Sequence, residues 1–100
     1  MPELLSAFVV ETSFRVPGLG VLVLPLAPTP AWLVAYALHT PLHLSLEVAG
    51  RPTTLLTGTV EEMAHNNQPP RRTLLLDFDP GGPLLAGSRL LVVQELPTLL

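Results

Sequence analysis

The sequence predicts an all-β fold, a small closed antiparallel β-barrel of six to eight strands formed by a single domain over residues 1–100. Short runs rich in valine, leucine and threonine recur at spacings of roughly 8–12 residues, which is typical of such folds. All 12 prolines and all but one of the 7 glycines stand outside these runs. No amphipathic helical pattern longer than two turns occurs. Closure suits strands this apolar, because it leaves no exposed sheet edge.

The first two predicted strands form a hairpin. Residues 9–16 mix β-branched and aromatic side chains with partial alternation, and residues 21–24 are apolar throughout, which indicates burial on both faces. Between them, Pro17 presets φ, and Gly18 and Gly20 permit the positive φ that a tight turn needs. Both glycines therefore have a structural role in the turn.

Residues 32–38 are compatible with either a short helix or a strand. Pro30 before them and Pro41 after them leave little room for a helix, so we expect a strand. Trp32 and Tyr36 would then share one face of that strand, where packing in the core is a commoner role than binding a ligand.

Four more strands complete the predicted barrel. Residues 43–48 alternate between polar and aliphatic side chains, as a strand with one buried face does. Residues 53–63 contain Gly58, which marks either a bulge or a close approach of another part of the chain. The last two strands are residues 72–78 and 90–95.

Turn-forming residues account for the remaining connections. Residues 65–70 are a polar loop, and residues 79–83 are a turn in which Gly81 and Gly82 supply the conformational freedom. Residues 96–100 are an apolar tail that we expect to pack on the barrel or on a neighbouring molecule.

The chain contains neither lysine nor cysteine. The absence of lysine excludes a P-loop and Schiff-base chemistry, and the absence of cysteine excludes a thiol nucleophile, a zinc ribbon and an iron–sulfur site. We therefore expect no nucleotide and no cofactor. The net charge is −3, and the five basic residues are scattered apart from Arg71 and Arg72, so nucleic-acid binding is not expected either.

Residues 21–38 are mostly apolar and long enough to be considered as a membrane span. Pro25, Pro28 and Pro30 lie inside this stretch, and each interior proline costs a helix about 3 kcal/mol. We therefore expect two short strands joined by a proline loop, and no membrane span. The N-terminus carries Glu3 where a signal peptide has basic residues, and the lack of cysteine suits a reducing compartment, so a cytoplasmic location is expected.

The histidines do not predict a metal site. On one face of a strand, His39 and His43 would lie about 13 Å apart at ~3.3 Å per residue, which is too far for the pair to chelate an ion alone. Two ordinary surface histidines are the better interpretation, and no metal is expected.

Acidic pairs do not predict a catalytic set. Asp77 and Asp79 could serve a hydrolase or calcium, but an Asp that ends a strand before a glycine turn usually caps that turn. Glu61 and Glu62 beside His65 could do acid–base work, but a solvated strand end is the commoner meaning. We predict no catalytic residue.

The stretch from Glu11 to Val23 combines an acidic residue, Phe14 and the glycine turn ahead of an apolar strand. In this it resembles the opening hairpin of the second, β-barrel domain of translational GTPases such as elongation factor Tu. The similarity continues in order and spacing through residues 46–50 and 57–63, closes with residues 74–76, 84 and 87–90, and covers most of residues 9–93.

This resemblance has three departures. Leu19 stands where the family has an arginine between the glycines, the proline loop of residues 25–30 replaces a glycine-rich hairpin, and residues 31–38 look like an insertion of about eight residues. The GTPase domain is absent from the sequence. The resemblance therefore implies a barrel without nucleotide hydrolysis.

In elongation factor Tu, this domain helps to hold the aminoacylated end of tRNA. Positions that match Glu11, Phe14 and either Glu61 or Glu62 lie near that pocket. The resemblance thus implies these four residues as candidates for contact with a ligand or partner.

The expected function is a non-enzymatic binding or interaction module that takes a protein partner or a second copy of itself. One alternative is a self-associating structural protein that uses residues 32–38 and 96–100 as its interface. A module associated with RNA or the ribosome, supported only by Arg71 and Arg72, and a hydrolase are further alternatives.

Overall fold

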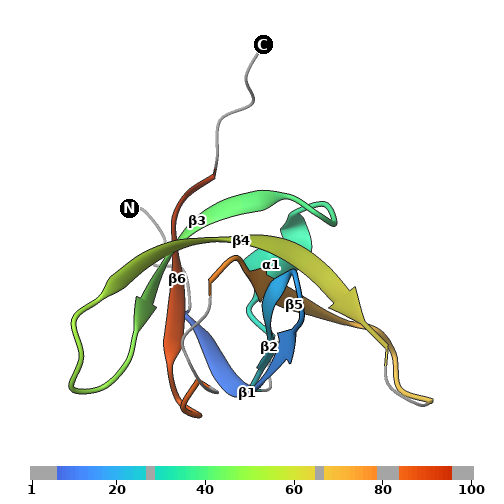
Figure 1. Cartoon of the computed structure of the whole chain (residues 1–100). Helices are drawn as coiled ribbons and strands as arrows, with labels where there is room; N and C mark the ends of the chain where they lie inside the picture. The colour runs from blue at the N-terminus through green and yellow to red at the C-terminus, as the bar shows by residue number, and fades with distance from the viewer. Residues whose placement is uncertain (1–6, 27–28, 65–66, 79–83, 96–100) are drawn as a thin grey trace.

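The computed structural model describes residues 7–26, 29–64, 67–78 and 84–95. Its six strands pair antiparallel and close into a barrel in the order β1-β2-β5-β4-β3-β6, which confirms the predicted all-β barrel (Figure 1). Each predicted strand other than residues 32–38 is present, with bounds within two residues of those expected. The elements are β1 (Phe8–Val16), β2 (Gly20–Pro25), α1 (Ala31–Ala35), β3 (Pro41–Glu47), β4 (Thr54–Met63), β5 (Arg71–Leu76) and β6 (Arg89–Glu95).

The core fills the inside of the barrel. Side chains alternate between the two faces of a strand, so each strand turns one row inward. Fully burying one aliphatic or aromatic side chain of such a row contributes roughly 1.5–3 kcal/mol. The buried core consists of Phe8, Val10, Val21, Val23, Leu33, Leu42, Leu44, Leu46, Leu56, Val60, Leu74, Leu76 and Leu90.

The β1–β2 hairpin turns where the glycines predict. The amide of Leu19 donates to the carbonyl of Val16 over 2.9 Å, and Gly18 and Gly20 have φ angles of +79° and +133°. A Cβ at Gly20 would also collide with the backbone carbonyl oxygen of Leu76, because β5 pairs with β2 there. The structural role of both glycines is confirmed, whereas Gly81 and Gly82 lie outside the described residues.

Gly58 is a point of close approach in β4. It is buried between two strands, with Leu42 of β3 as its partner on one side and Leu76 of β5 on the other. A Cβ at this position would lie 2.9 Å from Cδ1 of Leu44 and 3.1 Å from the carbonyl oxygen of Leu75. Of the two roles predicted for Gly58, the structure confirms the close approach.

The prediction that residues 32–38 form a strand is wrong. The chain forms the short helix α1 at Ala31–Ala35, with Pro30 at its N-cap and Tyr36 returning to an extended conformation. In the barrel order, β5 and β4 stand between β2 and β3, so this connection must pass over two strands. One turn of helix against β5 achieves this, and it places Leu33 in the core (Figure 1).

Two aromatic side chains of this segment contact each other because residues four apart lie on the same side of a helical turn. Trp32 and Tyr36 are four residues apart, and their rings make an edge-to-face contact with centroids 6.4 Å apart and planes at 79°. Both side chains are partly buried and pack against the core. The packing role predicted for them is therefore confirmed, although a helix end and not a strand brings them together.

Candidate functional site

An apolar groove lies on the outer face of the barrel. Phe14 pairs with Leu22 across the β1–β2 ladder, and Leu24 is the next outward residue of β2, since Val21 and Val23 point into the core. The far wall comes from the β4–β5 hairpin, where Met63 pairs with Arg71. The groove has a volume of about 480 Å³ and is lined by Phe14, Leu24, Met63, Gln68, Pro69 and Arg71.

Phe14 is the most informative residue of this groove. Its side chain is 48% exposed, although an aromatic ring of this size is usually buried. The neighbouring Leu24 and Met63 add aliphatic and thioether surface, so the ring stands beside an apolar hollow that the side chains of the described residues leave open. A half-exposed aromatic beside such a hollow is typical of a contact surface.

Arg71 is the one charged residue among the groove-lining residues. Its Nη2 donates to the carbonyl oxygen of Pro25 over 2.7 Å, which ties the first residue of β5 to the last residue of β2. Among the described residues, no ion pair involves Arg71. The groove therefore combines an apolar wall with one fixed cation.

Of the four residues implied by the resemblance, only Phe14 lines this groove. Glu11 is exposed and is the extra residue of a bulge between Val10 and Thr12 in β1. Glu61 lies on the outer face of β4, two residues before Met63, whereas the adjacent Glu62 points to the opposite face. Glu61 is thus the nearer of the two glutamates to the groove.

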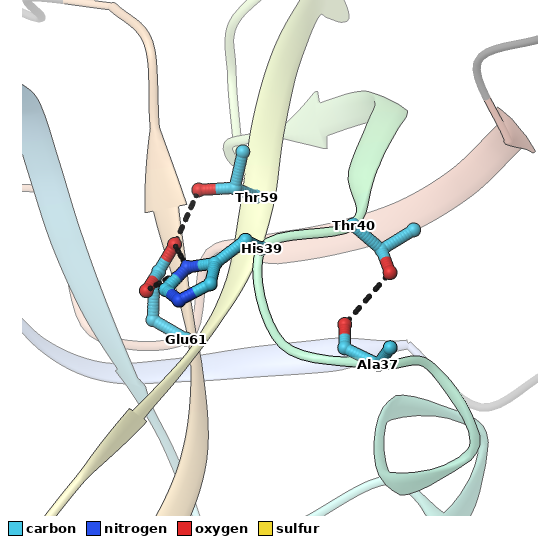
Figure 2. Close-up of polar contacts among 5 residues, drawn as sticks. All are labelled: Ala37, His39, Thr40, Thr59 and Glu61. Carbon is cyan, nitrogen blue, oxygen red and sulfur yellow. Dashed lines mark hydrogen bonds and ion pairs between the residues drawn. The ribbon is translucent and has the colours of Figure 1, made fainter. Parts of the chain in front are cut away.

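The carboxylate of Glu61 is already bonded within the chain (Figure 2). Nδ1 of His39 lies 3.0 Å from one carboxylate oxygen and 3.1 Å from the other, and Oγ1 of Thr59 donates to the latter over 2.8 Å. His39 is 76% exposed and Glu61 is 22% exposed in their side chains. This cluster fastens the connection that follows α1 to the outer face of β4.

His39 does not lie on a strand as expected. It has a φ of +71°, the left-handed region that side chains other than glycine seldom adopt, and its amide donates to the carbonyl of Val60 over 2.6 Å. Thr40 closes the preceding turn by donating from Oγ1 to the carbonyl of Ala37 over 2.7 Å (Figure 2). His43 is exposed on β3, so His39 and His43 share no strand face but are both at the surface.

The segment that resembles an insertion does not fill the groove. None of residues 31–38 belongs to the groove lining. Leu33 points into the core and Trp32 and Tyr36 pack against it, so the large side chains of this segment serve the barrel. Residues 31–38 therefore leave the groove at Phe14 open, and the adjacent His39 contacts Glu61.

The remaining polar candidates are separate from the groove. Asp77 is exposed after the end of β5 and lines a second hollow of about 280 Å³ beside the β1–β2 turn, whereas Asp79 and His65 lie outside the described residues. Ser88 is buried and donates from Oγ to the carbonyl of Leu85 over 2.7 Å, which is a local turn contact.

Neither a metal-binding cluster nor a membrane-spanning helix occurs among the described residues. Within the ranges that the structure describes, no three His, Asp or Glu side chains gather as metal ligands would. In the same ranges, no helix has both the length and the apolar character needed to cross a membrane.

Comparisons of the chain with protein-family models, with curated proteins and with solved structures found no match. The likeness to the elongation factor domain therefore rests on the sequence motifs alone. A closed six-stranded barrel does not identify a family, because small barrels of this kind serve many unrelated functions.

Sequence reasoning missed most of the groove. No role in binding was predicted for Leu24, Met63, Gln68 or Pro69. Arg71 was considered only together with Arg72, as a basic pair. A usable signal was the outward position of Phe14 and Leu24 in an alternating hairpin, since period 2 places both on the face opposite Val21 and Val23. The β4–β5 wall depends on pairing between distant strands, which one sequence does not reveal.

Proposed function

We propose that this protein is a non-enzymatic interaction module that binds a segment of a partner protein in the groove at Phe14. The proposal includes a barrel of the elongation factor domain 2 type, without GTPase activity of its own, that acts in the cytoplasm. The observation that carries it is the half-exposed ring of Phe14 beside an apolar hollow of about 480 Å³. This volume falls in the range of roughly 300–1,000 Å³ common for binding sites.

The residue types of the groove also support protein binding. Aromatic residues, methionine and arginine are enriched at protein interfaces, and the groove presents Phe14, Met63 and Arg71 together. A few such residues in a desolvated centre usually carry most of the binding energy. An apolar partner side chain that covers Phe14 would remove its remaining exposed surface from water.

The other candidate functions have weaker support. Self-association is expected to use residues 32–38 and 96–100, and residues 96–100 lie outside the described residues. In residues 32–38, Val34 and Leu38 are 59% and 41% exposed, whereas Trp32, Leu33 and Tyr36 pack in or on the core. An RNA role would rely on Arg71 and Arg72, but neighbouring residues of a strand point to opposite faces. The pair therefore does not form the cluster of cations that a phosphate backbone requires.

Selection of a displayed library of random peptides on the immobilised protein tests the proposal. We expect enriched peptides to bind the wild type and the variant Leu55→Asp, and to lose binding to Phe14→Asp. Leu55 is the matched control because it is 74% exposed, is the second residue of β4 and does not line the groove. Equal binding to Phe14→Asp, or no enrichment on folded wild-type protein, would contradict the proposal.

A further inference from the structure

We infer that the groove binds a carboxylate as well as apolar side chains. Its ligand is then a peptide segment in which an Asp or Glu stands beside aliphatic or aromatic residues. The inference rests on the proposed function and names the class of partner. Arg71 is the residue that would recognise the carboxylate.

The position of the Arg71 guanidinium is fixed by the chain itself. Nη2 donates to the carbonyl oxygen of Pro25, a fully buried residue at the end of β2. An arginine has five N–H donors in a planar fork, so this bond uses one of them and leaves others available in the groove wall. Holding the fork in place before binding reduces the side-chain entropy that a new contact would cost.

No acidic residue belongs to the described lining of the groove. On the outer face, Glu61 stands two positions before Met63, and its oxygens take contacts from His39 and Thr59. Glu11 is exposed at the bulge of β1. Glu62 points to the opposite face of β4. In a chain of net charge −3, this leaves an isolated positive site inside an apolar groove, to which an anionic group is complementary.

The anion that fits best is a side-chain carboxylate of a peptide. A guanidinium fork matches a carboxylate with two parallel hydrogen bonds, and Phe14, Leu24, Met63 and Pro69 provide the apolar surface for neighbouring side chains. A polynucleotide needs several clustered cations, and Arg72 faces the other side of the strand. The groove lies on the outside of the barrel, so a free alkyl chain there would remain partly in water.

Fluorescence anisotropy with an enriched peptide tests the inference. The probes are the peptide itself and its analogue in which each Asp or Glu is replaced by Asn or Gln. Each probe is titrated with wild type, Arg71→Gln and Arg72→Gln. On wild type we expect the neutral analogue to bind at least about ten-fold more weakly, as loss of a charge-assisted hydrogen bond implies. On Arg71→Gln we expect the two peptides to bind alike, whereas Arg72→Gln should retain the full difference.

The outcomes separate this inference from the proposed function. Recognition of a carboxylate is overturned if the enriched peptides lack acidic residues, or if the neutral analogue binds wild type as tightly as the parent peptide. Either result leaves the groove as a docking site. The claim that the carboxylate belongs to a peptide is overturned if decanoate competes for the groove as strongly as the peptide does. The comparison of the two peptides on wild type needs no variant, so it shows whether a carboxylate contributes to binding even if Arg71→Gln does not fold.

Discussion

Thr73 of β5 lies directly opposite Glu61 of β4, yet the two side chains share no hydrogen bond. The Glu61 carboxylate takes its contacts from Thr59 and His39, which approach along β4 and from the connection after α1. The side chain of Thr73 is fully buried, and its Oγ1 has no partner within the described part of the molecule. The outer face of the β4–β5 pair thus contains an unsatisfied hydroxyl.

Replacing that hydroxyl should stabilise the barrel. A buried polar group without a hydrogen bond costs roughly 1–3 kcal/mol, and valine has nearly the shape of threonine. We expect Thr73→Val to raise the free energy of unfolding by about 1 kcal/mol, measured by urea denaturation. The control is Thr59→Val, which removes a satisfied hydroxyl and should not stabilise; a less stable Thr73→Val variant would contradict the assignment.

The helix α1 has one fully buried side chain. Leu33 is 0% exposed, whereas the next residue, Val34, is 59% exposed. We expect Leu33→Ala to cost about 2–5 kcal/mol of stability, and Val34→Ala to stay within roughly 0.5 kcal/mol of wild type. Thermal denaturation of the two variants compares them. Equal losses would mean that α1 does not pack as described.

Gly58 should tolerate no side chain. A methyl group there meets Leu44 and the backbone of Leu75, and the backbone carbonyl has no freedom to move away within the ladder. We expect Gly58→Ala to destabilise the protein by about 1–3 kcal/mol, as overpacking of a core does. Thr57→Ala, on the outer face of the same strand, serves as the control and should cost less. An unfolding midpoint for Gly58→Ala equal to that of wild type would contradict the close approach.

The left-handed conformation of His39 predicts an unusual order of stabilities. A side chain other than glycine in this region costs about 1–2 kcal/mol, more for a β-branched residue, and an exposed ion pair such as His39–Glu61 is worth roughly 0–1 kcal/mol. We therefore expect His39→Gly to be about as stable as wild type and His39→Val to be clearly less stable in urea denaturation. A His39→Val variant as stable as His39→Gly would show that the turn does not hold this φ.

Local patterning was enough to predict the strands. Alternation in residues 43–48 and the glycine turn after Pro17 depend only on neighbours along the chain, and both are present in the barrel. Gly58 was predictable as a special position for the same reason, since a glycine inside a strand pattern needs a packing explanation. The sequence pattern did not show that Leu44 and Leu75 would be its neighbours.

The errors occurred where a distant part of the chain decides the outcome. Prolines at positions 30 and 41 argued against a helix, but Pro30 occupies the N-cap, and α1 is only five residues long and packs against β5. The connection from β2 to β3, of which α1 is a part, passes the two strands that stand between them in the barrel order. Arg71 and Arg72 looked like one basic pair, although strand geometry separates their side chains. The groove itself requires β1, β2, β4 and β5 to be neighbours, which is a property of the barrel order.

A chemical-shift map of the isotopically labelled protein during titration with an enriched peptide shows whether the peptide binds in the groove at Phe14. We expect the methyl signals of Leu24 and Met63 and the signals of Phe14 and Arg71 to shift together and to saturate at one dissociation constant. The signals of Leu55 and Leu85, which are exposed but do not line the groove, should not move. Shifts centred on Leu55 or Leu85, with Met63 unchanged, would contradict the assignment of the groove as the binding site.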